Sequence, residues 1–308
     1  MKKPMSVLVV GSIAIDEVKT PFEHHKDLLG GSASYASVAA SFFAPVRLVG
    51  VVGTDFPEAH RKLFEQRGVN VEGLQTAQGE TFRWSGEYSW DFNWRKTLSV
   101  ALNVFEHFEP TLPDGYRKTP FVLLGNIAPK LQLHVLSQLQ KPKFVVADTM
   151  DLWIETSKSD LLELLKQVDA LFLNDSEARE LTKQTSLIKA GQAILDYGPK
   201  YVVIKKGEHG SLLFSSNEFF TAPAYPLEDI HDPTGAGDCF AGGIVGYLAA
   251  QSTVDFAILK KAVVYGSVIA SFNVEAFSLG RLEKLKQNDI EERYQQIKIM
   301  SHFDDVDF

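Results

Sequence analysis

The chain has 308 residues, of which 45% are hydrophobic and 23% are charged, and its mean hydropathy is -0.06. These values are ordinary for a soluble globular protein, so they exclude a disordered or a fibrous chain. The formal net charge is -8, with 39 acidic and 31 basic residues, which argues against a nucleic-acid partner because such binding depends mainly on Lys and Arg.

Short runs of β-branched and other apolar residues alternate with amphipathic stretches along most of the chain. Continuous apolar runs that are separated by helices are typical of parallel strands covered on both faces. The strands expected in chain order are 7–11, 47–52, 121–124, 144–147, 170–173 and 201–204. The helices expected in chain order are 32–43, 57–67, 130–140, 161–167, 176–182, 187–197, 237–250, 254–272 and 283–300. The sequence therefore predicts a doubly wound α/β fold with a mostly parallel sheet flanked by helices.

Two segments, 13–25 and 80–104, interrupt this alternation and predict a smaller second sheet. The second segment carries aromatic residues largely at even spacing: Phe82, Trp84, Tyr88, Trp90, Phe92 and Trp94. A period of two predicts strands with one apolar face. We expect both segments to project as a lid from a single domain that spans residues 1–308, and a hairpin packed on the core is the alternative. An exposed aromatic face normally needs a cover, so we expect substrate or a second subunit on it, and hence a homodimer through the lid.

The strongest chemical signal is the string Asp-Pro-Thr-Gly-Ala-Gly-Asp at residues 232–238. Pro233 cannot continue a strand, the glycines permit a tight turn, and a helix is expected to begin near Asp238. Free N–H groups at the start of a helix, together with the helix dipole, form an anion site. A carboxylate at the same place can orient or deprotonate an attacking hydroxyl, as phosphoryl transfer requires. The alternative is an N-cap aspartate on a glycine-rich turn.

With residues 232–243 the chain resembles the ribokinase-like (PfkB) carbohydrate kinase family, because these residues match the C-terminal signature of that family. Further segments resemble family motifs in the same order along nearly the whole chain: 11–16, 30–31, 49–55, 174–177 and 205–210. The resemblance implies a ribokinase-like fold and an ATP-dependent transfer of the γ-phosphoryl group to the hydroxymethyl group of a small sugar. A nucleoside kinase similar to adenosine kinase is the alternative, and a non-catalytic ligand-binding member is a further one.

The resemblance also implies a role for each matching residue. Asp238 would be the catalytic base, and the backbone N–H groups of Gly235, Ala236 and Gly237 would form the anion hole. The residues expected at the substrate are Asp16, Gly30, Gly31, Tyr35 and Asn126. The residues expected along the nucleotide are Asn174, Lys205, Gly207, Gly210 and Thr234, with 277–280 near the adenine. Glu177, with Asn174, would hold Mg2+ through water, and a K+ ion near the Asp232 loop is left open.

Two of these assignments have a second interpretation. Asn174-x-x-Glu177 is also the pattern of a capping box at a helix N-terminus. Tyr35 stands where the N-terminal signature usually has an asparagine, and a phenol offers one hydroxyl and a ring in place of an amide. Asn126 would supply an amide from another direction. Polar contacts suffice for a simple sugar, whereas Tyr35 and the lid aromatics would suit the base of a nucleoside.

Other chemistries lack their motifs. The chain has no Gly-x-x-x-x-Gly-Lys-Ser/Thr string and no Gly-x-Gly-x-x-Gly after the first strand, which argues against a P-loop kinase and a Rossmann dehydrogenase. A single cysteine, Cys239, excludes an internal disulfide, and no apolar stretch approaches the roughly 18 residues that span a bilayer. We therefore expect a cytoplasmic protein whose partner is a small-molecule sugar or nucleoside, with no membrane and no nucleic acid.

Overall fold

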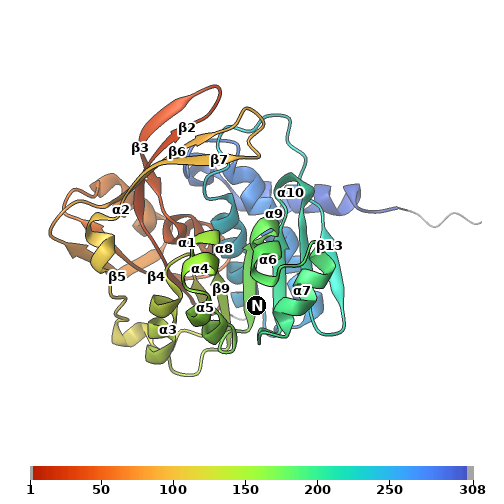
Figure 1. The fold of residues 1–308 in the computed structure, drawn as a ribbon. Coiled ribbons are helices and arrows are strands. Elements are labelled where there is room, and N and C mark those ends of the chain that lie inside the picture. Colours follow the sequence, from red (N-terminus) through yellow and green to blue (C-terminus); the bar gives the residue numbers. More distant parts are fainter. Residues whose placement is uncertain (1–2, 304–308) are drawn as a thin grey trace, which may run out of the picture.

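The computed structural model describes residues 3–303 and contains two β-sheets (Figure 1). The strands of the larger sheet are β1 (Val7–Val10), β4 (Val46–Gly53), β5 (Val69–Ala77), β8 (Phe121–Leu124), β9 (Phe144–Asp148), β10 (Ala170–Asn174), β11 (Tyr201–Lys205), β12 (Ser211–Phe214) and β13 (Phe219–Ala222). They lie in the order β13-β12-β11-β10-β9-β8-β1-β4-β5. All neighbours are parallel except β12, which is antiparallel to both β11 and β13. The predicted doubly wound, mostly parallel sheet is confirmed.

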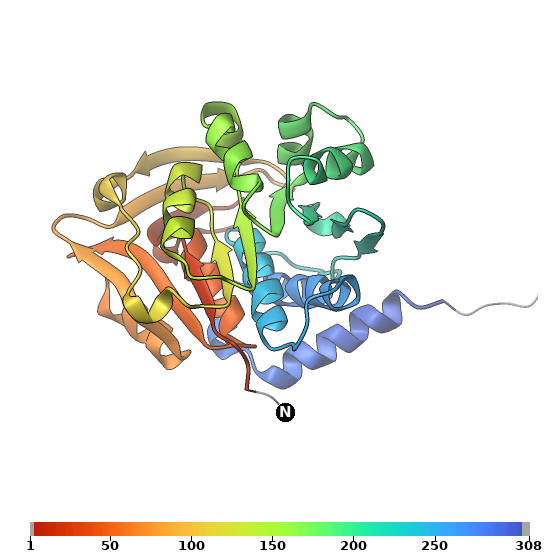
Figure 2. The ribbon, with the colours of Figure 1, turned by 90° about the horizontal axis from the view of Figure 1, so that it is seen from below.

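Successive residues of each strand point to opposite faces of this sheet, and helices cover the apolar side chains on both faces. Val7 and Val9 belong to one apolar cluster, whereas Leu8 and Val10 belong to the other. The first layer contains α1 (Ser32–Ser41), α2 (Glu58–Gln66), α8 (Ala236–Ala249), α9 (Phe256–Asn273) and α10 (Gln287–Met300). The second contains α3 (Pro129–Gln138), α4 (Asp151–Thr156), α5 (Lys158–Leu165), α6 (Asp175–Thr182) and α7 (Leu187–Leu195). Figure 2 shows α10 on the outer side of the first layer.

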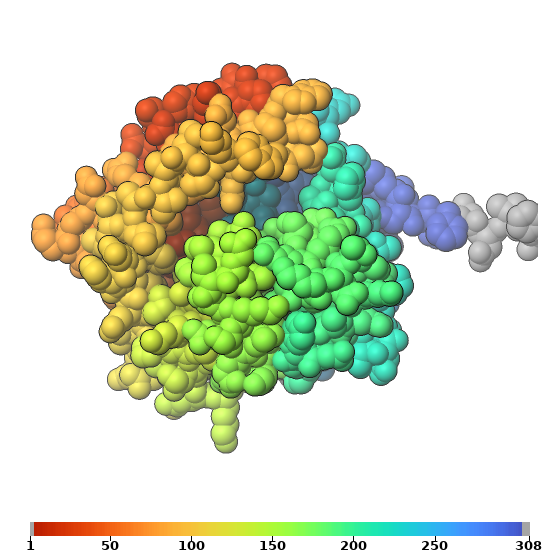
Figure 3. Space-filling model, viewed as in Figure 1, coloured from red at the N-terminus to blue at the C-terminus, as the bar shows by residue number. Residues whose placement is uncertain are grey.

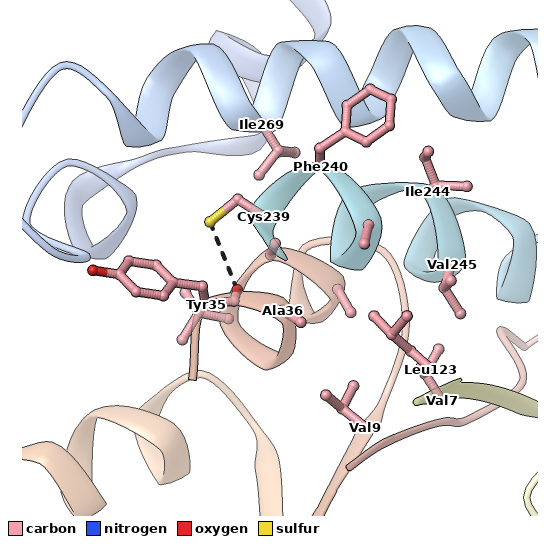
Figure 4. Close-up of a cluster of buried hydrophobic side chains, with 14 of the residues drawn as sticks. Val7, Val9, Tyr35, Ala36, Leu123, Cys239, Phe240, Ile244, Val245 and Ile269 are labelled. Atoms are coloured by element: carbon pink, nitrogen blue, oxygen red, sulfur yellow. Dashed lines mark hydrogen bonds between the residues drawn. The ribbon is translucent and has the colours of Figure 1, made fainter. Parts of the chain in front are cut away.

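Small residues bring α8 into close contact with α1. A Cβ atom on Gly242 would lie 2.3 Å from the carbonyl oxygen of Ala36, and one on Gly246 would lie 2.7 Å from that of Ala40. Neither glycine can therefore carry a larger side chain without moving α1 away. The apolar residues around this contact form the cluster in Figure 4, in which Cys239 lies near Tyr35 and Ala36, and Val7 and Val9 of β1 lie near Leu123.

Helix α9 is long and apolar enough, by length and composition, to cross a membrane, but 56% of that stretch is buried inside the protein. It packs between α8 and α10 in the first helical layer. Burial on this scale is typical of a core helix in a globular protein, because the apolar residues are already covered by protein.

The smaller sheet forms the predicted lid, which projects above the larger sheet in Figure 1. Its strands are β2 (Ala14–Lys19), β3 (His24–Gly30), β6 (Phe82–Tyr88) and β7 (Arg95–Ala101), in the order β3-β2-β6-β7. Strands β2 and β6 are parallel, and the outer pairs β2–β3 and β6–β7 are antiparallel.

Two details of the lid differ from the prediction. The first segment does not end at residue 25, because β3 continues to Gly30; its start is polar on both faces and shows no alternation. The aromatic positions beyond Tyr88 do not continue a strand. Trp90, Phe92 and Trp94 lie in the turn between β6 and β7, which closes where the N–H of Ser89 donates to the carbonyl oxygen of Trp94. The apolar strand face therefore ends at Tyr88.

The sequence analysis also missed β5, β12, β13 and α4. Strands β5 and β13 are the two edges of the larger sheet, and an edge strand is covered less completely than a central one. The polar residues Asn70, Glu72 and Gln75 therefore interrupt the apolar run of β5. Helix α4 has only 6 residues, too few to establish a helical period.

Candidate active site

The predicted site residues gather at the edge of the larger sheet where the parallel strands end. Strand β1 is the point at which the strand order reverses, since the chain moves from β1 to β4 on one side and later to β8 on the other. Ligands of open α/β sheets bind outside the carboxyl ends of the strands at such a point. The lid lies above this edge, and Figure 3 shows a hollow between the lid, in red and orange, and the green part of the body.

The segment that we call the anion-binding loop, residues 232–237, includes the first two residues of α8, which begins at Ala236. Gly235 has a φ of +76°, and a Cβ atom there would lie 2.3 Å from the ring of Tyr35, so only glycine fits the turn. The N–H of Ala236 donates to the carbonyl oxygen of Pro233 at 3.2 Å. The N–H groups of Gly235 and Gly237 make no hydrogen bond within residues 3–303 and are free for an anion.

Asp238 lies in the first turn of α8, beside these N–H groups. Burial, together with the charge of Asp148, raises its pKa to about 7, while Lys205 and Arg95 act in the opposite direction. The carboxylate of Asp238 is therefore a stronger base than an ordinary aspartate, and it exchanges its proton near neutral pH.

Lys205 forms a buried ion pair with Asp148, whose Oδ2 lies 2.7 Å from the lysine Nζ. Only 18% and 6% of the two side chains are exposed. A Cβ atom on Gly237 would lie 3.3 Å from the same Nζ, so the ammonium group reaches the start of α8. Burial lowers the pKa of Lys205, but Asp148 and Glu177 outweigh it and raise that pKa. The sequence analysis missed Asp148, which follows the predicted strand 144–147 by one residue.

Asn174 and Glu177 form a capping box at the start of α6. Oδ1 of Asn174 accepts from the N–H of Glu177 at 2.8 Å, and Oε2 of Glu177 accepts from the N–H of Asn174 at 2.7 Å. Burial raises the pKa of Glu177 to about 7, and the charge of Asp148 adds to the effect. The interpretation of this motif as a capping box is thus confirmed. Oε1 of Glu177 accepts no hydrogen bond from the described residues, so it is available to a ligand.

The carboxylates suit Mg2+ without forming a cage for it. Within residues 3–303 no group of three or more His, Cys, Asp or Glu side chains could hold a metal ion by itself. Mg2+ usually takes one or two carboxylates together with waters and substrate phosphates. Glu177 and Asp148 are hard oxygen donors of this kind, so the residues present fit a metal that arrives with a nucleotide.

Asp16 is a buried carboxylate at the base of the lid, with 4% of its surface exposed. Among the residues that the structure describes, its Oδ1 has no hydrogen-bond partner. A Cβ atom on Gly30 would lie 1.9 Å from its Oδ2, so the carboxyl group lies across that glycine. Gly31, with a φ of +91°, follows and starts α1. A buried carboxylate without a partner is costly, and the hydroxyls of a ligand would satisfy it.

Tyr35 and Asn126 are less directly engaged with the cleft. The ring of Tyr35 is buried beneath Gly235, and its hydroxyl has no hydrogen-bond partner. Figure 4 shows this hydroxyl directed away from the apolar cluster, while Sγ of Cys239 donates to the Tyr35 carbonyl oxygen. Asn126 is held from α4, since its Nδ2 donates to Sδ of Met150 and its Oδ1 accepts from Trp153. A substrate role for Asn126 stays a prediction.

A cavity of about 420 Å3 adjoins the anion-binding loop. Its polar end contains predicted nucleotide-site residues, Lys205, Gly207 and Gly210, and also Gly237. Its apolar wall comprises Ala224, Tyr225, Pro226, Leu227, Ile230, Pro233, Phe240, Ala270 and Val274. Asp91, Phe92 and Asn93 of the lid turn line it as well.

Several expected nucleotide residues do not line this cavity. Residues 277–280 pack elsewhere: the N–H of Ser278 donates to Oδ2 of Asp232, and the ring of Phe277 lies 4.0 Å from that of His25. The place of residues 277–280 near the adenine therefore stays a prediction that this cavity does not support. Asn174 and Thr234 do not line it either, and Thr234 bonds instead to the lid.

The lid brings Trp84, Tyr88 and Arg95 to the cleft, of which sequence reasoning had considered only the two aromatic residues, and those only as a surface for a base. Asp16 on β2 is aligned with Trp84 on β6, and Tyr88 at the end of β6 is aligned with Arg95 on β7. The Tyr88 hydroxyl lies 3.0 Å from that of Thr234 in the anion-binding loop. The even spacing of the aromatics was the available signal, but it did not indicate which face is turned to the cleft.

Comparisons with known proteins agree with this geometry. Residues 126–285 match the profile described as pfkB family carbohydrate kinase. A cytidine kinase from Thermococcus kodakarensis is 32% identical over 251 residues, which cover 79% of this chain and 88% of that protein. The crystal structure of a nucleoside kinase from Methanocaldococcus jannaschii has a TM-score of 0.76 at 20% identity and covers 96% of this chain and 100% of that chain. A ribokinase from Arabidopsis thaliana, complexed with ribose and ATP, has a TM-score of 0.76 at 20% identity and covers 96% and 99%.

The unpartnered carboxylate of Asp16 makes stability depend on pH. Burial, followed by the charges of Asp232 and Asp238, raises its pKa from 3.8 to about 8. Folding therefore favours the protonated form of Asp16. The protein has its full unfolding free energy with respect to this group below about pH 4, and it loses part of that free energy as the pH rises from about 4 to about 8. We expect Asp16→Asn to match the wild type at pH 4 and to exceed its unfolding free energy at pH 8 by at least about 1.4 kcal/mol, the equivalent of one pKa unit.

Urea unfolding between pH 4 and pH 9 measures this difference. Asp55→Asn is the control with the opposite sign: burial raises the pKa of Asp55, but hydrogen bonds from Thr81 outweigh it and lower that pKa. This control should lose stability relative to the wild type above about pH 4. A difference between Asp16→Asn and the wild type that does not change with pH would contradict the prediction.

Proposed function

Because the chain belongs to the pfkB family of carbohydrate kinases, it is an ATP-dependent kinase of a sugar or a nucleoside, and we propose that its acceptor is the ribose hydroxymethyl group of a nucleoside. The family resemblance inferred from the motifs is confirmed by the profile match. The sequence favoured a small sugar, and the family includes sugar kinases. The geometry of the lid and the 32% identity to a cytidine kinase both support the nucleoside.

The observation that carries this proposal is the alignment of Asp16 with Trp84. Strands β2 and β6 pair in parallel, so aligned residues point to the same face of the lid. Tyr88, on the same face of β6, contacts Thr234, so this face is turned to the cleft. The Trp84 ring lies over Gly86, where a Cβ atom would be 2.1 Å from it. A carboxylate beside an aromatic surface suits a ribose diol joined to a base, because bases stack on aromatic rings.

The residues around Asp238 support an in-line transfer. The acceptor oxygen forms a bond to the γ-phosphorus as the bond to the bridging oxygen breaks, and the acceptor proton passes to Asp238. Its raised pKa matches that task, since a general base works best near its own pKa. The free N–H groups of Gly235 and Gly237 would stabilise the charge that develops on the phosphoryl oxygens.

The donor would lie in the 420 Å3 cavity with its phosphates toward Lys205 and the start of α8. Glu177 and Asn174 would hold Mg2+ through water, and Asp148 adds a second buried carboxylate beside Lys205. Mg2+ bound there neutralises charge on the phosphate oxygens. A K+ ion near the Asp232 loop stays a prediction. The family match argues against the non-catalytic alternative, and so does the retention of Asp238, because a buried carboxylate is costly without a catalytic use.

A cytoplasmic location is also part of this proposal. The single cysteine, Cys239, is buried and forms no disulfide, which is compatible with a reducing compartment, and 56% of α9 is buried inside the protein.

Release of ADP from MgATP across matched panels of nucleosides, pentoses and hexoses tests the reaction. We expect a nucleoside-dependent rate that Asp238→Asn lowers by at least about 100-fold, because the proton acceptor is lost. For the wild type, kcat/KM should rise with pH and level off above about 7, since the base must be deprotonated. Asp114→Asn, on a side chain that is 96% exposed, is the control and should keep full activity. A rate that survives Asp238→Asn would reject this role for Asp238.

Trp84→Ala separates a nucleoside from a sugar as acceptor. We expect the KM for the nucleoside to rise about 10-fold or more, because stacking of a base on an aromatic ring contributes about 1–3 kcal/mol. The rate with free ribose should change less than about 2-fold. Trp90→Ala is the matched control, since that side chain is 81% exposed in the lid turn. Equal losses with ribose and nucleoside would remove the support for base stacking.

We also propose the homodimer through the lid. Strand β7 is an edge strand whose residues are all exposed, and Leu98 and Val100 expose 49% and 53% of their surface. Sedimentation should give a dimer for the wild type and a monomer for Leu98→Glu, because a charge on this edge opposes pairing. A wild-type monomer at high protein concentration would contradict the proposal.

A further inference from the structure

The lid touches the anion-binding loop through one buried hydroxyl. Tyr88 ends β6, and its hydroxyl oxygen lies 3.0 Å from Oγ1 of Thr234. Both residues are buried, with 8% and 9% of their surfaces exposed. Within residues 3–303, this is the one hydrogen bond between the lid hairpin 82–101 and the loop 232–237. Burial raises the pKa of Tyr88 to about 12, so the hydroxyl remains protonated at neutral pH.

Thr234 is held by three hydrogen bonds of different origin. Its N–H donates to Oδ1 of Asp232 at 2.9 Å, and its carbonyl oxygen accepts from Nδ2 of Asn273 at 2.8 Å. The first bond lies within the loop itself, and the second comes from α9 in the body of the protein. The third, to Tyr88, comes from the lid. Thr234 directly precedes Gly235, so what holds Thr234 also fixes the direction of the Gly235 N–H group.

A second contact joins the lid to the outer side of the same loop. Oε1 of Glu23, in the turn between β2 and β3, lies 3.4 Å from Nδ1 of His231, and its Oε2 lies 2.9 Å from Nε2 of His25. These groups are each about half exposed, so solvent competes with them. The Tyr88–Thr234 bond is shielded from water and is therefore the stronger constraint on the loop.

We propose that Tyr88 is a positioning residue that fixes the anion hole only when the lid is closed over the acceptor. Asp16, the residue proposed to hold the acceptor, lies on β2, and β2 is paired with β6, so the Tyr88–Thr234 bond joins the acceptor side of the lid to the anion-binding loop. Without that bond, the loop is held from the body alone, through the bonds of Asp232 to Val274 and Ser278 and the bond of Thr234 to Asn273. A lid that keeps the bond orders the loop for transfer to the acceptor rather than to water. This inference rests on the proposed kinase function.

A double-mutant cycle of Tyr88→Phe and Thr234→Val tests the coupling. We expect Tyr88→Phe to lower kcat about 5- to 10-fold, the value of one intramolecular hydrogen bond, and to change the KM for MgATP less than about 2-fold. In the Thr234→Val background the same change should cost less than about 2-fold, because the partner hydroxyl is already absent. Acceptor-free ATP hydrolysis should rise relative to transfer in Tyr88→Phe.

Tyr116→Phe is the matched control. It removes another buried tyrosine hydroxyl, which donates to the carbonyl oxygen of Asn70 at 3.0 Å far from the cleft. It should change stability by a similar amount and leave kcat unchanged. Equal losses from Tyr88→Phe in both Thr234 backgrounds would overturn the positioning role and leave the kinase function intact.

Hydrogen exchange decides the inference independently of activity. The hydrogen-bonded N–H groups of residues 234 and 236 should exchange faster in Tyr88→Phe and in Thr234→Val than in Tyr116→Phe. Unchanged protection in both variants would overturn the proposal. If the wild type transfers phosphate to no acceptor of the panels, the proposed function fails, and the exchange rates alone then support or overturn the contact between lid and loop.

Discussion

The close packing of α1 against α8 is the constraint on which the cleft depends. Gly242 and Gly246 let the two helices approach until backbone meets backbone. Their N-termini then lie together, and each is preceded by a glycine with positive φ, Gly31 and Gly235. Gly30 and Gly31, which are proposed to bind the acceptor, precede one helix, and the loop proposed to bind an anion precedes the other. The ring of Tyr35, from the first turn of α1, fills the space beneath Gly235 and ties the two starts together.

Burial of acidic groups is the electrostatic counterpart of this packing. Burial raises the pKa values of both Asp16 and Asp238. The charge of Asp238 raises the pKa of Asp16 further, and Arg95 acts in the opposite direction on both groups. Such groups reduce stability, which is typical of sites that are built to act on a ligand. Lys205 offsets part of the charge on the nucleotide side, where it pairs with Asp148. The acceptor side has no equivalent bond to Asp16, and that is where hydroxyl groups of a substrate would fit.

Much of the fold followed from the sequence because central strands and long helices have strong patterns. The run at 7–11 reads as a strand since both of its faces are covered, and the string 232–238 locates the start of α8 to within two residues. Edge strands such as β5 were missed because partial exposure admits polar residues. The turn at 89–94 was mistaken for strand, since aromatic residues at even spacing occur in both.

The sequence by itself determined the family and the reaction class and located the loop proposed for phosphoryl transfer, because that chemistry needs fixed residue types at fixed local spacing. Only the tertiary structure decided which other groups meet there. Asp148 ends β9 of the larger sheet, whereas Trp84 and Tyr88 lie on β6 of the lid, so their convergence depends on strand order and on how the lid is oriented. Alternation along a strand indicates which residues share a face. Which face is turned to the cleft is set by contacts between segments far apart in the chain.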